Sequence, residues 1–300
     1  MSENTLLFPT DLAANNQTRL QFAATLAKAL DVKLCLLHFM GVADAESSED
    51  VPQALLPAIE AMRKTMAERR DAAEKQLKLE QSVVQKLGVE CCVEFRNERA
   101  STGILDYAKE HPPAFVVLGL RSSSVSHSPL VQHVFGSTSS TVLRHSNVPV
   151  LALPPNATLP AALHKCKWVV GVDFSDENKR AISFVQPFVE KLQASIELVH
   201  ISAPLSRELD EPVNQLWADH AKQQLDELKA LLVPSAKTTF KQTPSDKTTG
   251  HALAEHASHR DASFLVLSAS GKGNLKKFFL GSTAERTLRY ATMPVFVVRG

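Results

Sequence analysis

The sequence contains few cysteines, and their arrangement is not typical of a metal site or a disulfide framework. The 300 residues include only Cys35, Cys91, Cys92 and Cys166. No two of them have the CxxC spacing, and no histidine pair lies near them, so a zinc site is not expected. We therefore predict free thiols in a reducing compartment and no metal held by the protein.

The chain also lacks an excess of charge and a long apolar run. Its net charge is +1 at pH 7, so no broad electrostatic attraction to nucleic acid or anionic lipid is expected. No apolar run approaches the roughly 20 residues that a membrane-spanning helix needs. The N-terminal sequence MSENTLLFPTDL has neither the basic segment nor the apolar core of a signal peptide. These absences predict a cytoplasmic protein that binds neither nucleic acid nor membrane.

Apolar runs and segments of helical periodicity alternate along the chain, which predicts the α/β class. In the first half we expect strands at residues 5–8, 32–39, 89–95, 115–118 and 148–153, and helices at 15–30, 53–87, 102–110 and 137–144. In the second half we expect strands at 168–172, 195–201, 237–242, 264–267 and 295–298, and helices at 178–192, 217–232, 250–259 and from 281. This order predicts parallel sheets with helices on both faces.

The two halves are copies of one unit. Residues 115–153 and 264–298 both pass through Gly-Ser-Thr, a helix with Leu-Arg and a proline before the last strand. Gly136 and Gly281 lie 145 positions apart, as do Pro149 and Pro294. This constant offset indicates a duplication. We predict units at residues 1–154 and 166–300, joined by the Pro- and Ala-rich linker 155–165.

A candidate anion site follows from the second unit. Parallel sheets bind ligands beyond the carboxyl ends of their strands, at the switch point that strands one and four flank if the order is 3-2-1-4-5. Asp173 ends the first strand of this unit, and the loop that follows the fourth strand begins at Ser268. Gly271 and Gly273 in that loop would let the backbone approach a phosphate.

The helix after this loop offers the second part of the candidate site. It begins at Gly281-Ser282-Thr283, and the free N–H groups of a helix start attract anions. Asp173 and Ser282 can also have purely structural roles, because Asp173 can simply start the next helix and Ser282 can be only an N-cap. No convincing nucleophile–base pair is found, and His38 and His200 are interpreted as core residues of their strands.

The pattern resembles the universal stress protein family in its tandem two-domain form. The segments FPTD and GVDFSDEN resemble the end of the family's first strand, and LLHF and LVHI resemble its second strand. The segment GSTAERTLRYATMPVFVV resembles its C-terminal block. The resemblance covers nearly the whole chain. It implies two flavodoxin-like (Rossmann-like) units, each with a five-stranded parallel sheet of order 3-2-1-4-5.

The resemblance also implies a site for ATP or another adenine nucleotide. ATP-binding members carry Gly-x-x-Gly, nine residues, and then Gly-Ser/Thr after the fourth strand. Here Gly271 holds the second glycine position, Gly281-Ser282 hold the last pair, and Ser268 replaces the first glycine. By resemblance, Asp173 and the backbone of Ile201 meet adenine, and Ser268 lies near the ribose. Gly271, Gly281 and Ser282 lie near the phosphates.

The first unit departs further from the family pattern. Gly119 keeps the first glycine and Gly136-Ser137 keep the last pair, while Asp11 and Phe39 hold the positions of Asp173 and Ile201. Between Gly119 and Gly136 the loop is four residues longer and has lost the middle glycine. A degenerate nucleotide site is therefore predicted in this unit.

The implied function is a stress-response binding or signalling module with little or no turnover. Two alternatives remain at this point, a non-nucleotide interaction protein with vestigial sites and a slow ATPase. An exposed edge strand invites pairing, and family resemblance implies that strand five of one unit pairs with strand five of the other, 148–153 against 293–298. We expect an intramolecular pseudo-dimer, and a homodimer of the whole chain stays open.

Overall fold

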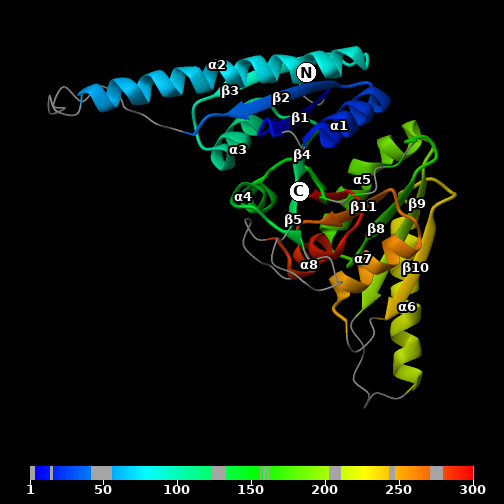
Figure 1. Ribbon diagram of the computed structural model, residues 1–300. Helices are drawn as coiled ribbons and strands as arrows, with labels where there is room; N and C mark the ends of the chain where they lie inside the picture. Colours follow the sequence, from blue (N-terminus) through cyan, green and yellow to red (C-terminus); the bar gives the residue numbers. More distant parts are fainter. Residues whose placement is uncertain are drawn as a thin grey trace.

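The computed structural model describes residues 4–13, 16–41, 56–122, 133–155, 157, 160, 162–202, 211–242, 247–270 and 280–299. Strands from both halves join in one ten-stranded sheet, with the order β10-β9-β8-β11-β12-β7-β4-β1-β2-β3 (Figure 1). The expected α/β class with helices on both faces is confirmed.

The first half contains the sheet order β3-β2-β1-β4-β7, which is the predicted order 3-2-1-4-5. Its strands are β1 (Thr5–Thr10), β2 (Lys33–Phe39), β3 (Cys91–Arg96), β4 (Phe115–Gly119) and β7 (Val150–Leu153). Its helices are α1 (Gln17–Leu30), α2 (Leu56–Lys86), α3 (Ala100–Glu110) and α4 (Ser137–His145). A short antiparallel ribbon, β5 (Arg121–Ser122) with β6 (His133–Val134), stands where the sequence predicted only a loop.

The second half repeats this arrangement in the order β10-β9-β8-β11-β12. Its strands are β8 (Lys167–Gly171), β9 (Ser195–Ser202), β10 (Lys237–Gln242), β11 (Phe264–Ser268) and β12 (Val295–Val298). Its helices are α5 (Asp176–Lys191), α6 (Glu211–Lys229), α7 (Thr249–His259) and α8 (Ser282–Tyr290). Helix α6 starts earlier than its periodicity predicted, and α5 runs through Pro187 to Lys191.

The duplication is visible in the backbone as well as in the sequence. Leu12 (φ 57°) and Phe174 (φ 61°) both adopt the left-handed conformation in the turn after the first strand of their half. Asp31 (φ 55°) and Gln193 (φ 49°) do so after the first helix. Each pair lies 162 positions apart. Since this conformation is costly for residues other than glycine, its recurrence shows that both halves build these turns in the same way.

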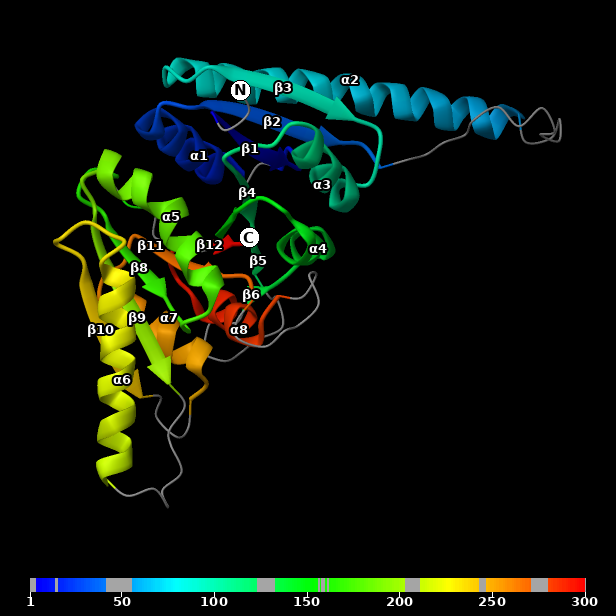
Figure 2. The ribbon, with the colours of Figure 1, turned by 180° about the vertical axis from the view of Figure 1, so that it is seen from behind.

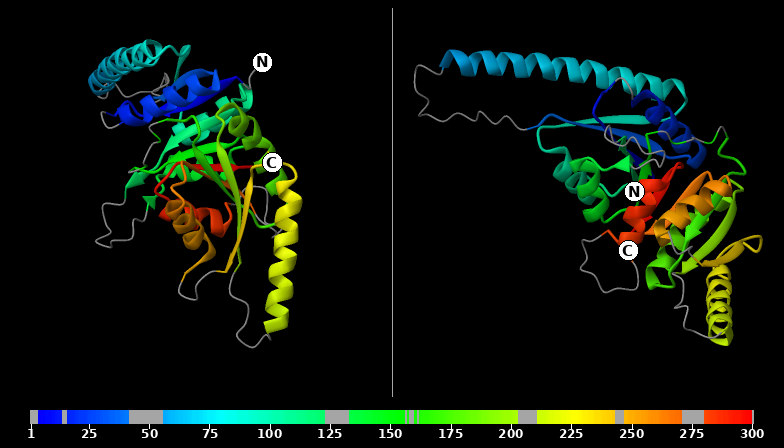
Figure 3. Two further views of the ribbon diagram at one scale, coloured as in Figure 1. Left: turned by 90° about the vertical axis from the view of Figure 1, so that its right-hand side faces the viewer. Right: turned by 60° about the horizontal axis from the view of Figure 1, so that its bottom comes forward.

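The helices divide between the two faces of the sheet (Figure 2). Buried side chains of α1, α2, α5 and α6 belong to one core, and those of α3, α4, α7 and α8 belong to the other. Helices α2 and α6 pack on the end strands, so they lie at opposite ends of the sheet (Figure 3). The first half of α2 projects beyond the sheet, and its charged side chains form a solvated face as expected.

The two halves meet through their last strands, as predicted. Strand β12 pairs antiparallel with β7, with Phe296 opposite Leu151. Phe296 also packs at 5.0 Å from Phe115 of the first half and at 5.6 Å from Trp168 of the second half, measured between ring centroids. Both cores contain residues of each half, and the two halves form a pseudo-dimer within one chain. In the part of the chain that is described, no helix is long and apolar enough to cross a membrane.

Candidate functional site

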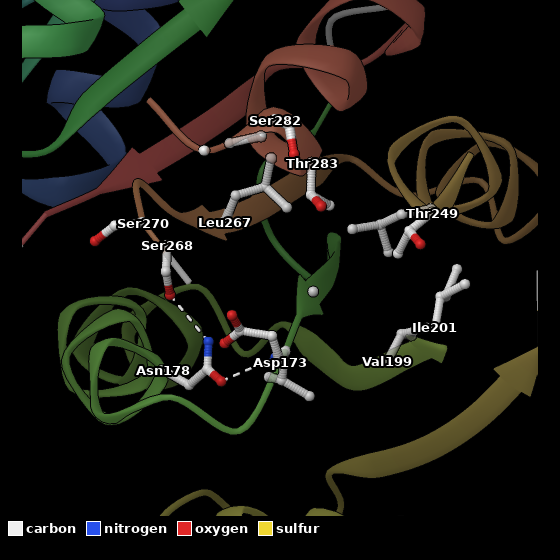
Figure 4. Close-up of a pocket in the computed structure, with 15 residues that line it drawn as sticks. Asp173, Asn178, Val199, Ile201, Thr249, Leu267, Ser268, Ser270, Ser282 and Thr283 are labelled. Atoms are coloured by element: carbon white, nitrogen blue, oxygen red, sulfur yellow. Dashed lines mark hydrogen bonds between the residues drawn. The ribbon is translucent and has the colours of Figure 1, made fainter. Parts of the chain in front are cut away.

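A cavity of about 300 Å³ lies at the carboxyl ends of β8, β9 and β11 in the second half (Figure 4). From β8 the chain continues to β9 on one side, while β11 lies on the other, so the cavity occupies the switch point of this half. The residues that line it are Gly171, Val172, Asp173, Asn178, Val199, Ile201, Thr249, Leu253, Leu267, Ser268, Ser270, Gly281, Ser282, Thr283 and Ala284.

The structure brings most of the predicted site residues to this cavity. Six of them line it: Asp173, Ile201, Ser268, Gly281, Ser282 and Thr283. They come from the ends of three strands and the start of one helix, although up to 110 positions separate them in the sequence. Gly271 and Gly273 lie outside the described residues.

Asp173 lines the cavity and also shapes the turn before α5. Its Oδ1 accepts hydrogen bonds from the Ser175 hydroxyl (2.7 Å) and from the Ser175 N–H (3.1 Å). The structural interpretation of Asp173, as a residue that helps to start the next helix, is therefore correct for this oxygen. Because the carboxylate also faces the cavity, the two interpretations do not exclude each other.

Asn178 joins the two sides of the cavity, although no sequence motif pointed to it. Its side chain is almost fully buried. Its Oδ1 accepts from the N–H groups of Asp173 (3.0 Å) and Ser175 (3.2 Å), and its Nδ2 donates to Ser268 Oγ (2.9 Å). These bonds tie the end of β8 to the end of β11 (Figure 4). One signal could have revealed it, because Asn16 occupies the same position of the repeat, 162 residues earlier.

Helix α8 presents an uncapped start to the cavity. Its N-cap is Gly281, which makes no side-chain capping bond, and Ser282 is the first residue of the helix. The interpretation of Ser282 as an N-cap is therefore wrong, because the cap position belongs to the preceding glycine. With no capping side chain, the first N–H groups are oriented as in other anion-binding helix starts, and Ser282 and Thr283 add hydroxyls.

The other end of the cavity is apolar. Val199, Ile201, Leu253 and Leu267 contribute its walls. Gly171 lets Leu253 pack closely against the end of β8, because a Cβ there would lie 2.4 Å from Leu253 Cδ2. An apolar end and a helix start on one cavity suit a ligand that carries both a flat ring and an anionic group.

A second cavity, of about 310 Å³, occupies the equivalent place in the first half. All five residues predicted for the weaker site line it: Asp11, Phe39, Gly119, Gly136 and Ser137. Arg19 also enters this cavity, and its Nη2 donates to the Leu120 carbonyl (2.7 Å). A Cβ on Gly119 would lie 2.5 Å from Arg19 Nη1, so the guanidinium covers the backbone where Ser268 stands in the second half. The equivalent of Arg19 there is Ala181.

The two strand histidines have structural roles. His38 Nδ1 lies 2.8 Å from the Thr10 carbonyl, and His200 Nδ1 lies 2.8 Å from the Val172 carbonyl. Since a carbonyl can only accept, each Nδ1 donates, and each ring links the second strand of its half to the first. No cluster of three or more His, Cys, Asp or Glu side chains within the described ranges could hold a metal ion.

Comparison with known proteins supports one family. The universal stress protein family model matches residues 4–154 and again residues 167–299. A universal stress protein of Mycolicibacterium smegmatis is 23% identical, covering 99% of this chain and 98% of that protein. Universal stress protein YxiE of Bacillus subtilis is 22% identical and aligns over 98% of its own length with 44% of this chain.

A solved structure has the same architecture along its whole length. The structure of a universal stress protein from Archaeoglobus fulgidus matches 100% of this chain and 99% of its own, with a TM-score of 0.67 and 19% identity. At that identity the likeness concerns the fold alone. The two segments matched by the family model account for nearly all residues of the chain, and the chain therefore belongs to the universal stress protein family, as two tandem copies.

Proposed function

We propose that the chain is a stress-response binding or signalling module of the cytoplasm, and that its second half binds ATP or a related adenine nucleotide with little or no turnover. One observation carries the nucleotide proposal. Six residues that the sequence singled out converge from separate strands and one helix on a single cavity of about 300 Å³. Membership of the universal stress protein family supports the stress-response role.

In this proposal the apolar end of the cavity receives adenine. Asp173 and the Ile201 backbone contact the base, and Ser268 lies near the ribose. Asn178 holds Ser268 in place, because its Nδ2 donates to Ser268 Oγ. The Ser268 hydroxyl can then direct its own hydrogen toward a ribose oxygen.

The helix start receives the phosphates. Gly281, Ser282 and Thr283 provide N–H groups and hydroxyls at the positive end of the α8 dipole. Gly271 and Gly273 complete this part of the proposal on the sequence pattern. The proposed boundaries, at residues 154 and 166, place β1 to β7 in one unit and β8 to β12 in the other.

Titration calorimetry of ligand-free protein with ATP, ADP and AMP tests the proposal. We expect micromolar affinity and one site per chain. Asp173→Ala should weaken binding about tenfold or more, which corresponds to about 1.4 kcal/mol. The matched variant Asp11→Ala, in the first half, should leave the affinity unchanged. A wild-type protein without micromolar affinity for any of the three nucleotides would refute the nucleotide proposal.

Two observations favour a second candidate, a non-nucleotide interaction protein. Ser268 replaces the first glycine of the nucleotide loop, and Arg19 covers Gly119 in the first half. If both sites reject nucleotides, this candidate stands. Arg19→Ala separates the two ideas for the first half, because a second nucleotide site should appear in this variant only if the guanidinium is what blocks it.

A further inference from the structure

Two cysteines stand next to each other at the edge of the sheet in the first half. Cys35 on β2 and Cys92 on β3 are direct register partners in a parallel pair, so their side chains leave the same face of the sheet. Paired strands lie about 4.8 Å apart, which falls within the range of about 4.4–6.8 Å between the Cα atoms of disulfide-bonded cysteines. Strand β3 is the last strand of the sheet, so it can adjust without displacing a further neighbour.

A hydrogen bond and the strand register place these two thiols. Tyr107 Oη lies 3.4 Å from Cys35 Sγ, and Cys92 is the register partner of Cys35 on the neighbouring strand. The neighbouring Cys35 thiol lowers the pKa of Cys92 to about 7. The neighbouring Cys92 thiol, followed by burial, raises the pKa of Cys35 far above its ordinary value. Cys92 is therefore the more acidic of the two thiols, and Cys35 keeps its proton at neutral pH.

The two thiols differ in their access to solvent. Cys92 is exposed and opens into a crevice of about 440 Å³ that Tyr107 and His111 also line. Cys35 lies behind it and is only 1% exposed. This arrangement is typical of an attacking thiol with a neighbouring resolving thiol.

The other two cysteines lack these properties. Cys91 is buried, and burial raises its pKa to about 12. Cys166 is buried and accepts a hydrogen bond from Trp168 Nε1 at 3.0 Å. In the second half the position of Cys35 is taken by Glu197, which Arg260 and Thr239 bind. The fold thus does not require the thiol pair, which belongs to the first half alone.

We propose that Cys92 and Cys35 form a reversible thiol–disulfide site that hydroperoxides oxidise. The Cys92 thiolate attacks one peroxide oxygen, the O–O bond breaks, and a sulfenic acid and hydroxide form. The Cys35 sulfur then attacks the Cys92 sulfur, its proton leaves with the departing hydroxide as water, and the S–S bond forms. The proton that Cys92 had released neutralises the first hydroxide. Together the two thiols lose two electrons and two protons, and hydrogen peroxide becomes two waters.

Peroxide treatment of the reduced full-length protein, followed by alkylation and mass spectrometry, tests the site. Of the four free thiols, two should become resistant to alkylation, the mass should fall by two hydrogens, and a Cys35–Cys92 peptide should appear that dithiothreitol removes. Cys35→Ser should give a dimedone-reactive sulfenic acid at residue 92 and no disulfide. Cys92→Ser should give neither product, and Cys91→Ser should behave as the wild type.

The alkylation rate gives a second measurement. At pH 7 a pKa of about 7 leaves about half of Cys92 ionised, against about 3% for an ordinary cysteine. Because nucleophilicity falls with pKa, the net gain is roughly threefold. Retention of all four thiols after peroxide, a disulfide that involves Cys91, or alkylation no faster than an ordinary thiol would overturn the proposal. Peptide mapping of the wild type decides the matter even if Cys35→Ser does not fold.

Discussion

Replacement of Asn178 by alanine tests how the candidate nucleotide site is held together. The substitution removes three hydrogen bonds, two accepted from backbone N–H groups and one donated to Ser268 Oγ. A buried hydrogen bond contributes about 1 kcal/mol, and Asn178 is 1% exposed. We therefore expect the free energy of unfolding to fall by about 3 kcal/mol.

The duplication supplies a matched control. Asn16 holds the same position in the first half, and the described contacts of its side chain comprise one hydrogen bond, from Nδ2 to Thr10 Oγ1 (3.1 Å). Asn16→Ala should therefore cost about 1 kcal/mol. Urea denaturation at equilibrium measures both values. Equal losses in the two variants would refute the view that Asn178 joins β8 to β11.

A second substitution separates the two functions of Asn178. Asn178→Asp keeps the acceptor oxygen for the N–H groups of Asp173 and Ser175 but can no longer donate to Ser268. Its stability should lie closer to that of the wild type than to that of Asn178→Ala. Its nucleotide affinity should nevertheless fall, because a carboxylate then faces the site that the phosphates and ribose are proposed to occupy. Unchanged affinity would contradict the placement of the nucleotide beside residue 178.

Three further predictions concern stability. Glu80 is buried, and burial raises the pKa of its carboxyl group. Ionisation of this carboxyl group therefore destabilises the folded protein as the pH rises, and Glu80→Gln should raise the urea midpoint at pH 7 more than at pH 4. For Glu197, burial raises the pKa, but the hydrogen bonds from Arg260 and Thr239 outweigh this effect, so the pKa is lowered overall. Glu197 therefore stabilises the fold above about pH 4.3, and this stabilisation is lost in acid. Glu197→Gln should make the loss of stability below that pH shallower. Phe296→Ala should cost about 3–5 kcal/mol and expose both halves to limited proteolysis, since its ring packs against both; proteolysis of one half alone would contradict a shared core.

Much of the architecture could be predicted because it is encoded locally. Strands buried on both faces appear as continuous apolar runs, and the constant offset between copies shows the duplication without any structure. The strand order and the pairing of the last strands followed from family resemblance. The ribbon of β5 and β6 was missed because two-residue strands at Arg121 and His133 leave no periodicity to detect.

Six of the eight residues predicted for the second half reached one cavity, because parallel strands bring their carboxyl ends to the same edge of the sheet. Their detailed contacts could not be predicted. The start of α8 at Ser282, with Gly281 as its cap, depends on how the chain leaves the preceding loop, and both assignments fit the same Gly-Ser-Thr sequence.

The order of local segments thus determined the α/β units, their number and the general location of the site. The tertiary structure decided which side chains touch. Asn178 and Ser268 are 90 positions apart, Arg19 and Leu120 are 101 apart, and Cys35 meets Cys92 through the register of two strands. Such contacts depend on packing and register, and no local pattern records them, because each residue alone is compatible with many partners.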